Sequence, residues 1–170
     1  QRVVIDAKGR VVMRYDYDML GNRIHQASME AGERWMLNDV AGKPLYAWDS
    51  RNHRFRTAYD PLRRPIDSFM QEGAGIELLV GRTVYGETRL NPEADNLRGK
   101  VVELRDQTGI VTTDKYDFKG NLLRSQRQLT QTYKTTVDWS STISLEPETY
   151  TSRTSYDALN RSTQLIAPHS

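Results

Sequence analysis

A short phrase that begins with Asp recurs eight times along this chain of 170 residues. The chain holds 13 Asp, 11 Gly and 7 Asn, so random placement would put Gly or Asn three residues after an Asp about 1.4 times. This spacing occurs at seven aspartates, which are Asp6, Asp18, Asp39, Asp49, Asp106, Asp117 and Asp157. An eighth copy begins at Asp60, with Pro61 after it and Arg63 in the Gly position. A periodic chain takes its fold from the repeated unit, so this phrase constrains the fold most.

The phrase has the composition of a hairpin turn. Asp at the first position of a type I turn accepts hydrogen bonds from the backbone, and Gly or Asn suits a left-handed residue after it. The residues in that position are Gly9, Gly21, Gly42, Asn52, Gly109, Gly120 and Asn160. An aromatic residue precedes the Asp in five copies, as Tyr17, Trp48, Tyr59, Tyr116 and Tyr156. The pattern predicts strand, turn and strand in each copy, and therefore an all-β fold of short antiparallel strands in a curved repeat sheet.

The copies are unevenly spaced along what we expect to be one structural unit, residues 1–170. Residues 1–68 are regular, residues 97–125 hold two clear copies, and residues 153–170 hold the last. We expect residues 69–96 to be an insertion with loops, and residues 126–152 to be a polar surface excursion or a lone strand pair. Residues 28–37 fit a helix and a strand about equally well.

Composition limits the classes of function. The hydrophobic fraction is 37% and the mean hydropathy is -0.71, which suits a sheet with a solvated face. Cys is absent, so disulfides and thiolate metal sites are excluded. The net charge of +2 does not indicate a polyanion-binding role. No apolar run is long enough for a membrane span, and the first residue is Gln1, so we interpret the chain as a piece of a longer protein.

Candidate catalytic and metal sites are weak, and we expect neither an enzyme nor a cofactor. The segment that starts at Asp16 opens like a calcium loop, but its twelfth position is Ala27 where a bidentate Glu is needed. Glu146-Pro147-Glu148 has the Glu-x-Glu form of ADP-ribosyltransferases without their separate strand elements. The histidines, His25, His53 and His169, have no metal-ligand spacing.

One basic stretch is interleaved with aromatic residues. Phe55 and Tyr59 lie among Arg51, His53, Arg54, Arg56, Arg63 and Arg64. Such a stretch can bind single-stranded nucleic acid. The alternative is two strands whose Arg side chains cover neighbouring carboxylates, and the nearly balanced net charge favours it.

Several copies of the phrase extend into longer motifs. These are Tyr17-Asp18-Met19-Leu20-Gly21-Asn22-Arg23-Ile24, Tyr116-Asp117-Phe118-Lys119-Gly120-Asn121 and Tyr156-Asp157-Ala158-Leu159-Asn160-Arg161, with longer matches over residues 25–35 and 96–100. With them the chain resembles the YD-repeat (Rhs) family, and most of all the B-component, SpvB-like part of bacterial insecticidal toxin complexes. Departures are Arg63 in a Gly position, and Asn38 and Arg105 in place of the aromatic residue.

The resemblance implies a β-rich strip that spirals into a hollow shell around a toxic polypeptide. We therefore expect a non-catalytic wall segment of a secreted or cell-surface bacterial protein. Its partners would be neighbouring repeats of the same or a companion shell polypeptide and the enclosed toxin, with no nucleic acid and no membrane span. The alternative function is a β-repeat module that binds carbohydrate or protein, with Trp35, Trp48 and exposed Tyr residues as platforms.

Overall fold

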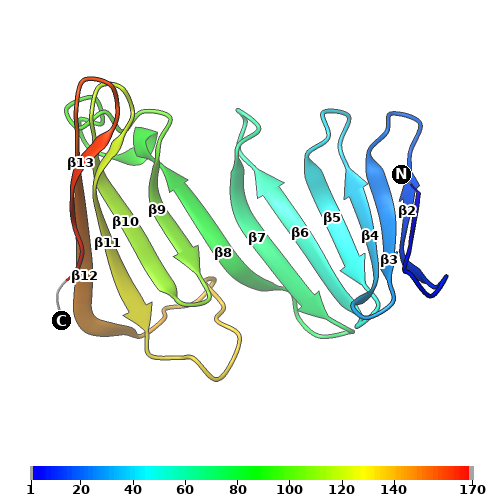
Figure 1. Ribbon diagram of the computed structural model, residues 1–170. Helices are drawn as coiled ribbons and strands as arrows, with labels where there is room; N and C mark the ends of the chain where they lie inside the picture. Colours follow the sequence, from blue (N-terminus) through cyan, green and yellow to red (C-terminus); the bar gives the residue numbers. More distant parts are fainter. Residues whose placement is uncertain (1, 169–170) are drawn as a thin grey trace. The chain divides into compact units, whose positions relative to one another are not determined.

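The computed structural model describes residues 2–168, and the chain divides into two compact units, Gln1–Leu78 and Leu79–Ser170. Both units consist of antiparallel strands that are neighbours in sequence (Figure 1). The described residues contain no α-helix, only one short 3-10 turn. The all-β prediction is confirmed. His169 lies outside the described residues.

The first unit is a meander in which each strand pairs with the strands directly before and after it in the chain. Its strands are β1 (Val3–Ile5), β2 (Val11–Tyr17), β3 (Arg23–Ser28), β4 (Gly32–Asn38), β5 (Pro44–Asp49), β6 (His53–Tyr59) and β7 (Pro65–Glu72). The register opposes Trp35 to Trp48 in β4 and β5. Residues 28–37, for which helix and strand were equal alternatives, form the end of β3, a turn and β4.

Residues 2–78 contain no fully buried side chain. Each strand leaves side chains of both faces half-buried or exposed, so this unit is a single layer without a core of its own. Its order must therefore come from the backbone ladder, from cross-strand side-chain pairs and from the turns.

The second unit has strands β8 (Leu78–Tyr85), β9 (Val101–Asp106), β10 (Gly109–Tyr116), β11 (Leu122–Thr130), β12 (Leu145–Tyr156) and β13 (Ser162–Ile166). Here a small core exists, and its hydrophobic members are Leu79, Leu97, Val102, Val137 and Trp139. Residues 69–96, expected to be an insertion with loops, include all of β8 and the 3-10 turn Gly86–Thr88. The loop that follows buries Leu97 instead of extending into solvent.

Residues 126–152 were expected to form a polar surface excursion or a lone strand pair. Residues 126–130 and 145–151 do pair with each other, but residues 126–129 also pair with β10, so the pair is part of the larger sheet. Residues 126–130 end β11 and residues 145–152 begin β12, so the loop between the strands is limited to residues 131–144. This loop folds back on the sheet, because the Trp139 amide donates to the Leu79 carbonyl at 2.8 Å and the Leu79 amide donates to Asp138 Oδ1 at 3.0 Å. Val137 and Trp139 are thereby buried. The polar composition of the loop had concealed two widely spaced core residues.

We predict that Trp139→Ala destabilises the second unit by about 3–5 kcal/mol, because a large buried aromatic side chain would leave a cavity. The matched control is Tyr133→Ala in the same loop, since Tyr133 is 81% exposed and Trp139 only 4%. Tyr133→Ala should change the free energy of unfolding by about 0.5 kcal/mol or less. Urea denaturation measures both variants, and equal effects would contradict the assignment of Trp139 to the core.

Candidate functional site: a ladder of aspartate turns

The turn at Asp18 shows how the repeated phrase folds. The Asp18 amide donates to the Asn22 carbonyl at 2.9 Å, and the Gly21 amide donates to the Asp18 carbonyl at 3.2 Å. Oδ1 of Asp18 accepts the amides of Leu20 at 2.9 Å and Asn22 at 2.8 Å. Oδ1 accepts the same two amides in the turns of Asp6, Asp39, Asp49, Asp117 and Asp157. One carboxylate oxygen thus satisfies two turn amides that have no strand partner.

The third residue after the Asp is left-handed in these turns. Its φ lies between 61° and 87° at Gly9, Gly21, Gly42, Asn52, Arg63, Gly120 and Asn160. The strand pairing shifts register beside the turn at Asp18, which is the bulge expected when three residues connect two strands. Asn tolerates this conformation better than most residues with a side chain, whereas Arg at position 63 requires a compensating contact.

The fourth residue after the Asp completes the turn, and the sequence interpretation missed it. Nδ2 of Asn22 donates to Asp18 Oδ2 at 3.0 Å, and Nε of Arg64 donates to Asp60 Oδ2 at 2.7 Å. Arg10, His53, Asn121 and Arg161 make the equivalent contact in their turns. The signal is visible in the sequence, because a residue with a side-chain nitrogen fills this position in seven of the eight copies.

These contacts lower the pKa of the turn carboxylates. The side-chain bond from Asn22 is the largest cause of the lowered pKa of Asp18, followed on the lowering side by the backbone amides. The backbone and side-chain bonds from Arg161 lower the pKa of Asp157. Each bond favours the charged form of the carboxylate.

Alternate turns of the first unit are tied to one another. Asp18, Asp39 and Asp60 lie 21 residues apart, and the turns after β2, β4 and β6 share one end of the unit because antiparallel strands reverse direction. The Arg63 guanidinium pairs with Asp39 of the preceding turn in this row, and Nζ of Lys43 donates to the Arg63 carbonyl. The presence of Arg at position 63, where most copies of the repeat have Gly, therefore has a structural reason, since the Arg63 side chain joins two turns.

The second unit repeats this arrangement with other residues. Nζ of Lys119 donates to the Ala158 carbonyl, and Nδ2 of Asn121 donates to Asn160 Oδ1 at 3.0 Å. The turns after β10 and β12 are thereby joined across the strand reversal between them.

The aromatic residue before the Asp anchors some turns to the adjacent strand. The Tyr59 hydroxyl donates to the Pro44 carbonyl at 2.6 Å, and the Tyr116 hydroxyl donates to the Val101 carbonyl at 2.9 Å. Burial raises the pKa of Tyr59. Trp48 instead stacks on Tyr46 with ring centroids 5.8 Å apart, while Tyr17 and Tyr156 end β2 and β12.

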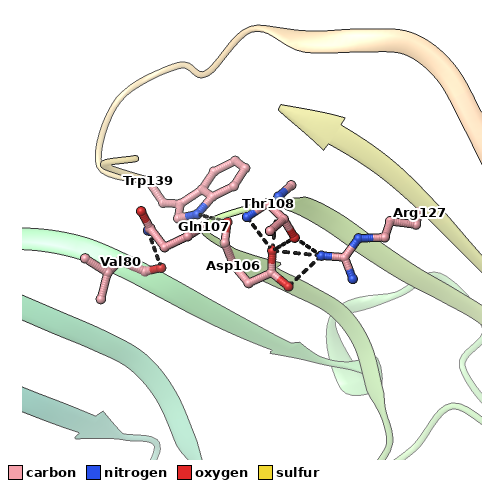
Figure 2. A network of polar contacts seen from close by, with 7 residues as sticks. Val80, Asp106, Gln107, Thr108, Arg127 and Trp139 are labelled. Carbon is pink, nitrogen blue, oxygen red and sulfur yellow. Dashed lines mark hydrogen bonds and ion pairs between the residues drawn. The ribbon is translucent and has the colours of Figure 1, made fainter. Parts of the chain in front are cut away.

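The turn at Asp106 differs from the others. Gly109 pairs directly with Asp106, so only two residues connect β9 to β10, and Gly109 is a strand residue with a φ of 143°. The Asp106 carboxylate accepts the Thr108 amide at 2.7 Å and Arg127 Nη2 at 2.7 Å (Figure 2). No polar side chain stands at position 110, so the Arg of β11 takes that role.

Gln107 in this turn holds the folded-back loop in place. Its Nε2 donates to the carbonyls of Val80 at 2.8 Å and Val137 at 3.0 Å, and its Oε1 accepts the Val137 amide at 2.8 Å. The Trp139 indole donates to the Asp106 carbonyl at 3.0 Å (Figure 2). The polar groups of this turn thus form hydrogen bonds with backbone amides and carbonyls around the core of the second unit.

One face of the first unit carries a row of stacked rings and ion pairs. The rings of His25 and Trp35 are stacked at 5.2 Å, and Trp48 opposes Trp35 on the next strand. His25 Nδ1 contacts Asp16 Oδ2 at 2.9 Å. Further along the face, the Arg56 guanidinium lies 3.8 Å from the Phe69 ring centroid and binds Glu77 through Nε and Nη2.

Most basic side chains between Arg51 and Arg64 pair with carboxylates of several different residues. Arg54 and Arg56 pair with Glu77, Arg63 pairs with Asp39, Arg64 pairs with Asp60, and His53 contacts Asp49. This is the arrangement expected from two strands whose Arg side chains cover acidic neighbours. It leaves little unpaired positive charge for a phosphate backbone.

Residues 2–168 show no group of three or more His, Asp or Glu side chains able to hold a metal ion. Within the same range there is no helix that is long and apolar enough to cross a membrane. Glu146 and Glu148 lie on β12, where the Tyr150 hydroxyl donates to Glu148 Oε2 at 2.9 Å.

The fold is an antiparallel strand-and-turn repeat, and solved structures of toxin complexes share it. The Photorhabdus luminescens Tc holotoxin pore is 20% identical with a TM-score of 0.84, and the match covers 94% of this chain and 8% of that chain. The crystal structure of TcdB2-TccC3-TEV is also 20% identical, with a TM-score of 0.82 and coverage of 94% and 8%. TcdB2-TccC3 without its hypervariable C-terminal region is 18% identical, with a TM-score of 0.82 and coverage of 98% and 9%.

These matches establish that the chain has the fold of a toxin-complex repeat segment, which the family resemblance led us to expect. The chain spans less than a tenth of the length of the chains it matches. No protein-family model and no curated protein matches the sequence.

We predict that Gly21→Val destabilises the chain by about 2 kcal/mol, because a β-branched residue is strained at a φ of 84°. No atom lies within 4 Å of an added Cβ at Gly21, so the effect would come from the backbone conformation alone. Gly21→Asn is the matched control and should lower the free energy of unfolding by less than Gly21→Val, since Asn52 and Asn160 also have a left-handed backbone conformation. Equal melting temperatures for both variants would contradict the turn assignment.

We predict that acid destabilises the chain through these turns. The pKa of the Asp18 and Asp117 carboxyl groups in the folded state lies below their ordinary value of 3.8. The stabilisation that these carboxylates give is therefore fully present above about pH 3.8 and is lost as the pH falls through the lowered pKa. Urea midpoints measured at pH 6 and pH 3 should differ in the wild type. Asp18→Asn with Asp117→Asn should show a smaller difference, and an unchanged difference would assign the acid sensitivity to other groups.

Proposed function

We propose that this chain is a structural, non-catalytic segment of a YD-repeat shell related to those of bacterial toxin complexes. In this proposal the complete shell encloses a toxic polypeptide. The observation that carries the proposal is the fold match to TcdB2-TccC3-TEV over 94% of the chain. That match concerns 8% of the longer chain, so the shell and its contents are inferred for the parent protein. The corresponding location is outside the cell or on its surface.

The chemistry of the turns supports a structural role. The conspicuous carboxylates are the turn aspartates, and their oxygens accept backbone and side-chain bonds within the turn. A general acid or base needs a carboxylate that can reach a substrate proton. The first unit also lacks a buried core, so it depends on extended pairing, and neighbouring repeats are the partners that would continue it.

Protection of the cargo tests the proposal. The full polypeptide that carries this segment, together with any companion shell chain, is treated with protease before and after mild acid or urea. Enclosure predicts that the segment beyond the repeats resists cleavage until the shell opens. A variant with Gly21→Val and Gly120→Val should lose protection at a lower urea concentration, because both positions have a φ above 80°. Cleavage of the native complex as fast as of the isolated cargo would contradict enclosure.

A second candidate function is carbohydrate or protein binding, and the exposed tryptophans favour it. Trp35 is 39% exposed and Trp48 36% exposed on adjacent strands, and Trp48 also lines a shallow pocket of about 300 Å³ with Arg34, Ala47 and Phe55. A glycan array with the wild type and with Trp35→Ala and Trp48→Ala tests this. Absence of retention by the wild type would contradict the candidate.

A further inference from the structure

The two ends of the strands differ in the residues at the turn tips. Turns in the row that contains Asp18 carry at least one large apolar residue at the first or second position after the Asp. In the first unit these residues are Met19, Leu20, Val40 and Leu62; in the second unit, considered by itself, Phe118 and Leu159 occupy the same positions in the turns after β10 and β12. At the opposite end of the first unit, two turn tips carry Ala7-Lys8 and Ser50-Arg51, and the other two turns contain one exposed apolar residue each, Met29 at 50% and Ile76 at 78%. Large apolar residues are thus most frequent in the row that contains Asp18, where every turn of the first unit carries at least one next to the Asp or one residue further on.

The apolar tips of the first unit are exposed to solvent. Met19 and Val40 are fully exposed at 104% and 97%, Leu20 is 77% exposed and Leu62 is 69% exposed. Together they present roughly 500 Å² of apolar surface, which is within the size range of the largest apolar patch on a typical monomer, a patch that is often functional. We call Met19, Leu20, Val40 and Leu62 the apolar turn row.

The apolar turn row is rigidly spaced. Arg63 pairs with Asp39, and Lys43 donates to the Arg63 carbonyl, so the turns that carry Val40 and Leu62 are joined directly. A Cβ added at Gly42 would lie 3.6 Å from Asn22 Oδ1, which places the first turn against the second. Since the turns recur after every second strand, the tips repeat at about 10 Å, twice the distance between strands.

The charges beside the row are already paired. Arg63 is held by Asp39 and Arg64 by Asp60, so the row presents apolar groups without a large excess of one charge. A like-charged row would repel a copy of itself, whereas this one does not. The row also lacks the Trp, Phe and free basic residues that anchor a protein at a lipid surface.

We propose that the apolar turn row is an interaction surface, and that its occupant is the same row of a second copy of this chain. A row with a spacing of two strands is matched best by another row of the same spacing. A two-fold arrangement brings identical patches together, with the central tip, Val40, nearest the axis. The total buried area would be about 1,000 Å², which corresponds to a weak and concentration-dependent dimer. This inference does not rest on enclosure of a cargo.

The absence of Cys in the chain allows a site-specific cross-linking test. Val40→Cys places a single thiol at the centre of the row, and Ala7→Cys places one at the equivalent position of a turn at the opposite end. Both residues are exposed, so neither substitution removes a core contact. Under mild oxidation we expect Val40→Cys to form disulfide dimers several-fold faster than Ala7→Cys.

Sedimentation equilibrium provides the second measurement. The wild type should show a reversible monomer–dimer equilibrium, and the variant with Met19→Ser, Leu20→Ser, Val40→Ser and Leu62→Ser should remain a monomer with an unchanged circular dichroism spectrum. Equal cross-linking at positions 7 and 40 would overturn the proposal, because it indicates association through strand edges. A wild type that remains a monomer up to about 1 mM would also overturn it. So would row-dependent binding to phosphatidylcholine vesicles, which would assign the row to a lipid surface.

Discussion

The interaction on which this structure depends is a carboxylate that accepts two backbone amides inside a three-residue turn. In the Asp18 turn one oxygen binds the amides of Leu20 and Asn22, and the other oxygen binds the Asn22 side chain. A short turn leaves these amides without strand partners, and an unpaired polar group costs free energy where water cannot reach it. The same solution recurs along the chain, so the strands are kept in register by local contacts that do not require a core.

The two units use these turns in different surroundings. In the first unit no residue among 2–78 is fully buried, and the turns are reinforced by links such as Arg63 to Asp39. In the second unit residues 131–144 fold back, and Trp139 and Val137 supply a small core. The two-residue turn at Asp106 belongs to that core, since Gln107 and the Asp106 carbonyl bind the loop. Departures from the repeat thus occur where the chain makes a contact that the regular turn cannot make.

The all-β fold could be predicted from the sequence because Asp and Gly at a fixed spacing encode a local conformation. The partner at the fourth position, such as Asn22 or Arg64, was missed because the feature that these residues share, a side-chain nitrogen, is seen only when the copies are aligned on their Asp. The role of Arg63 was not predictable, because its partner Asp39 is distant in the sequence. The burial of Trp139 was hidden by polar neighbours, since contacts of a folded-back loop leave no periodic signal.

The proposed role as a wall segment requires rigid turns and exposed edges rather than a reactive site, and the turn amides report on that rigidity. Native-state hydrogen exchange at the Asn22 and Asn121 amides tests the account most directly, because each donates to a turn carboxylate at 2.8 Å. Both amides should exchange much more slowly than unfolded peptide amides at pH 6, and faster when Asp18 and Asp117 are replaced by Ala. Exchange at the unfolded rate in the wild type would show that the carboxylates do not hold the turns.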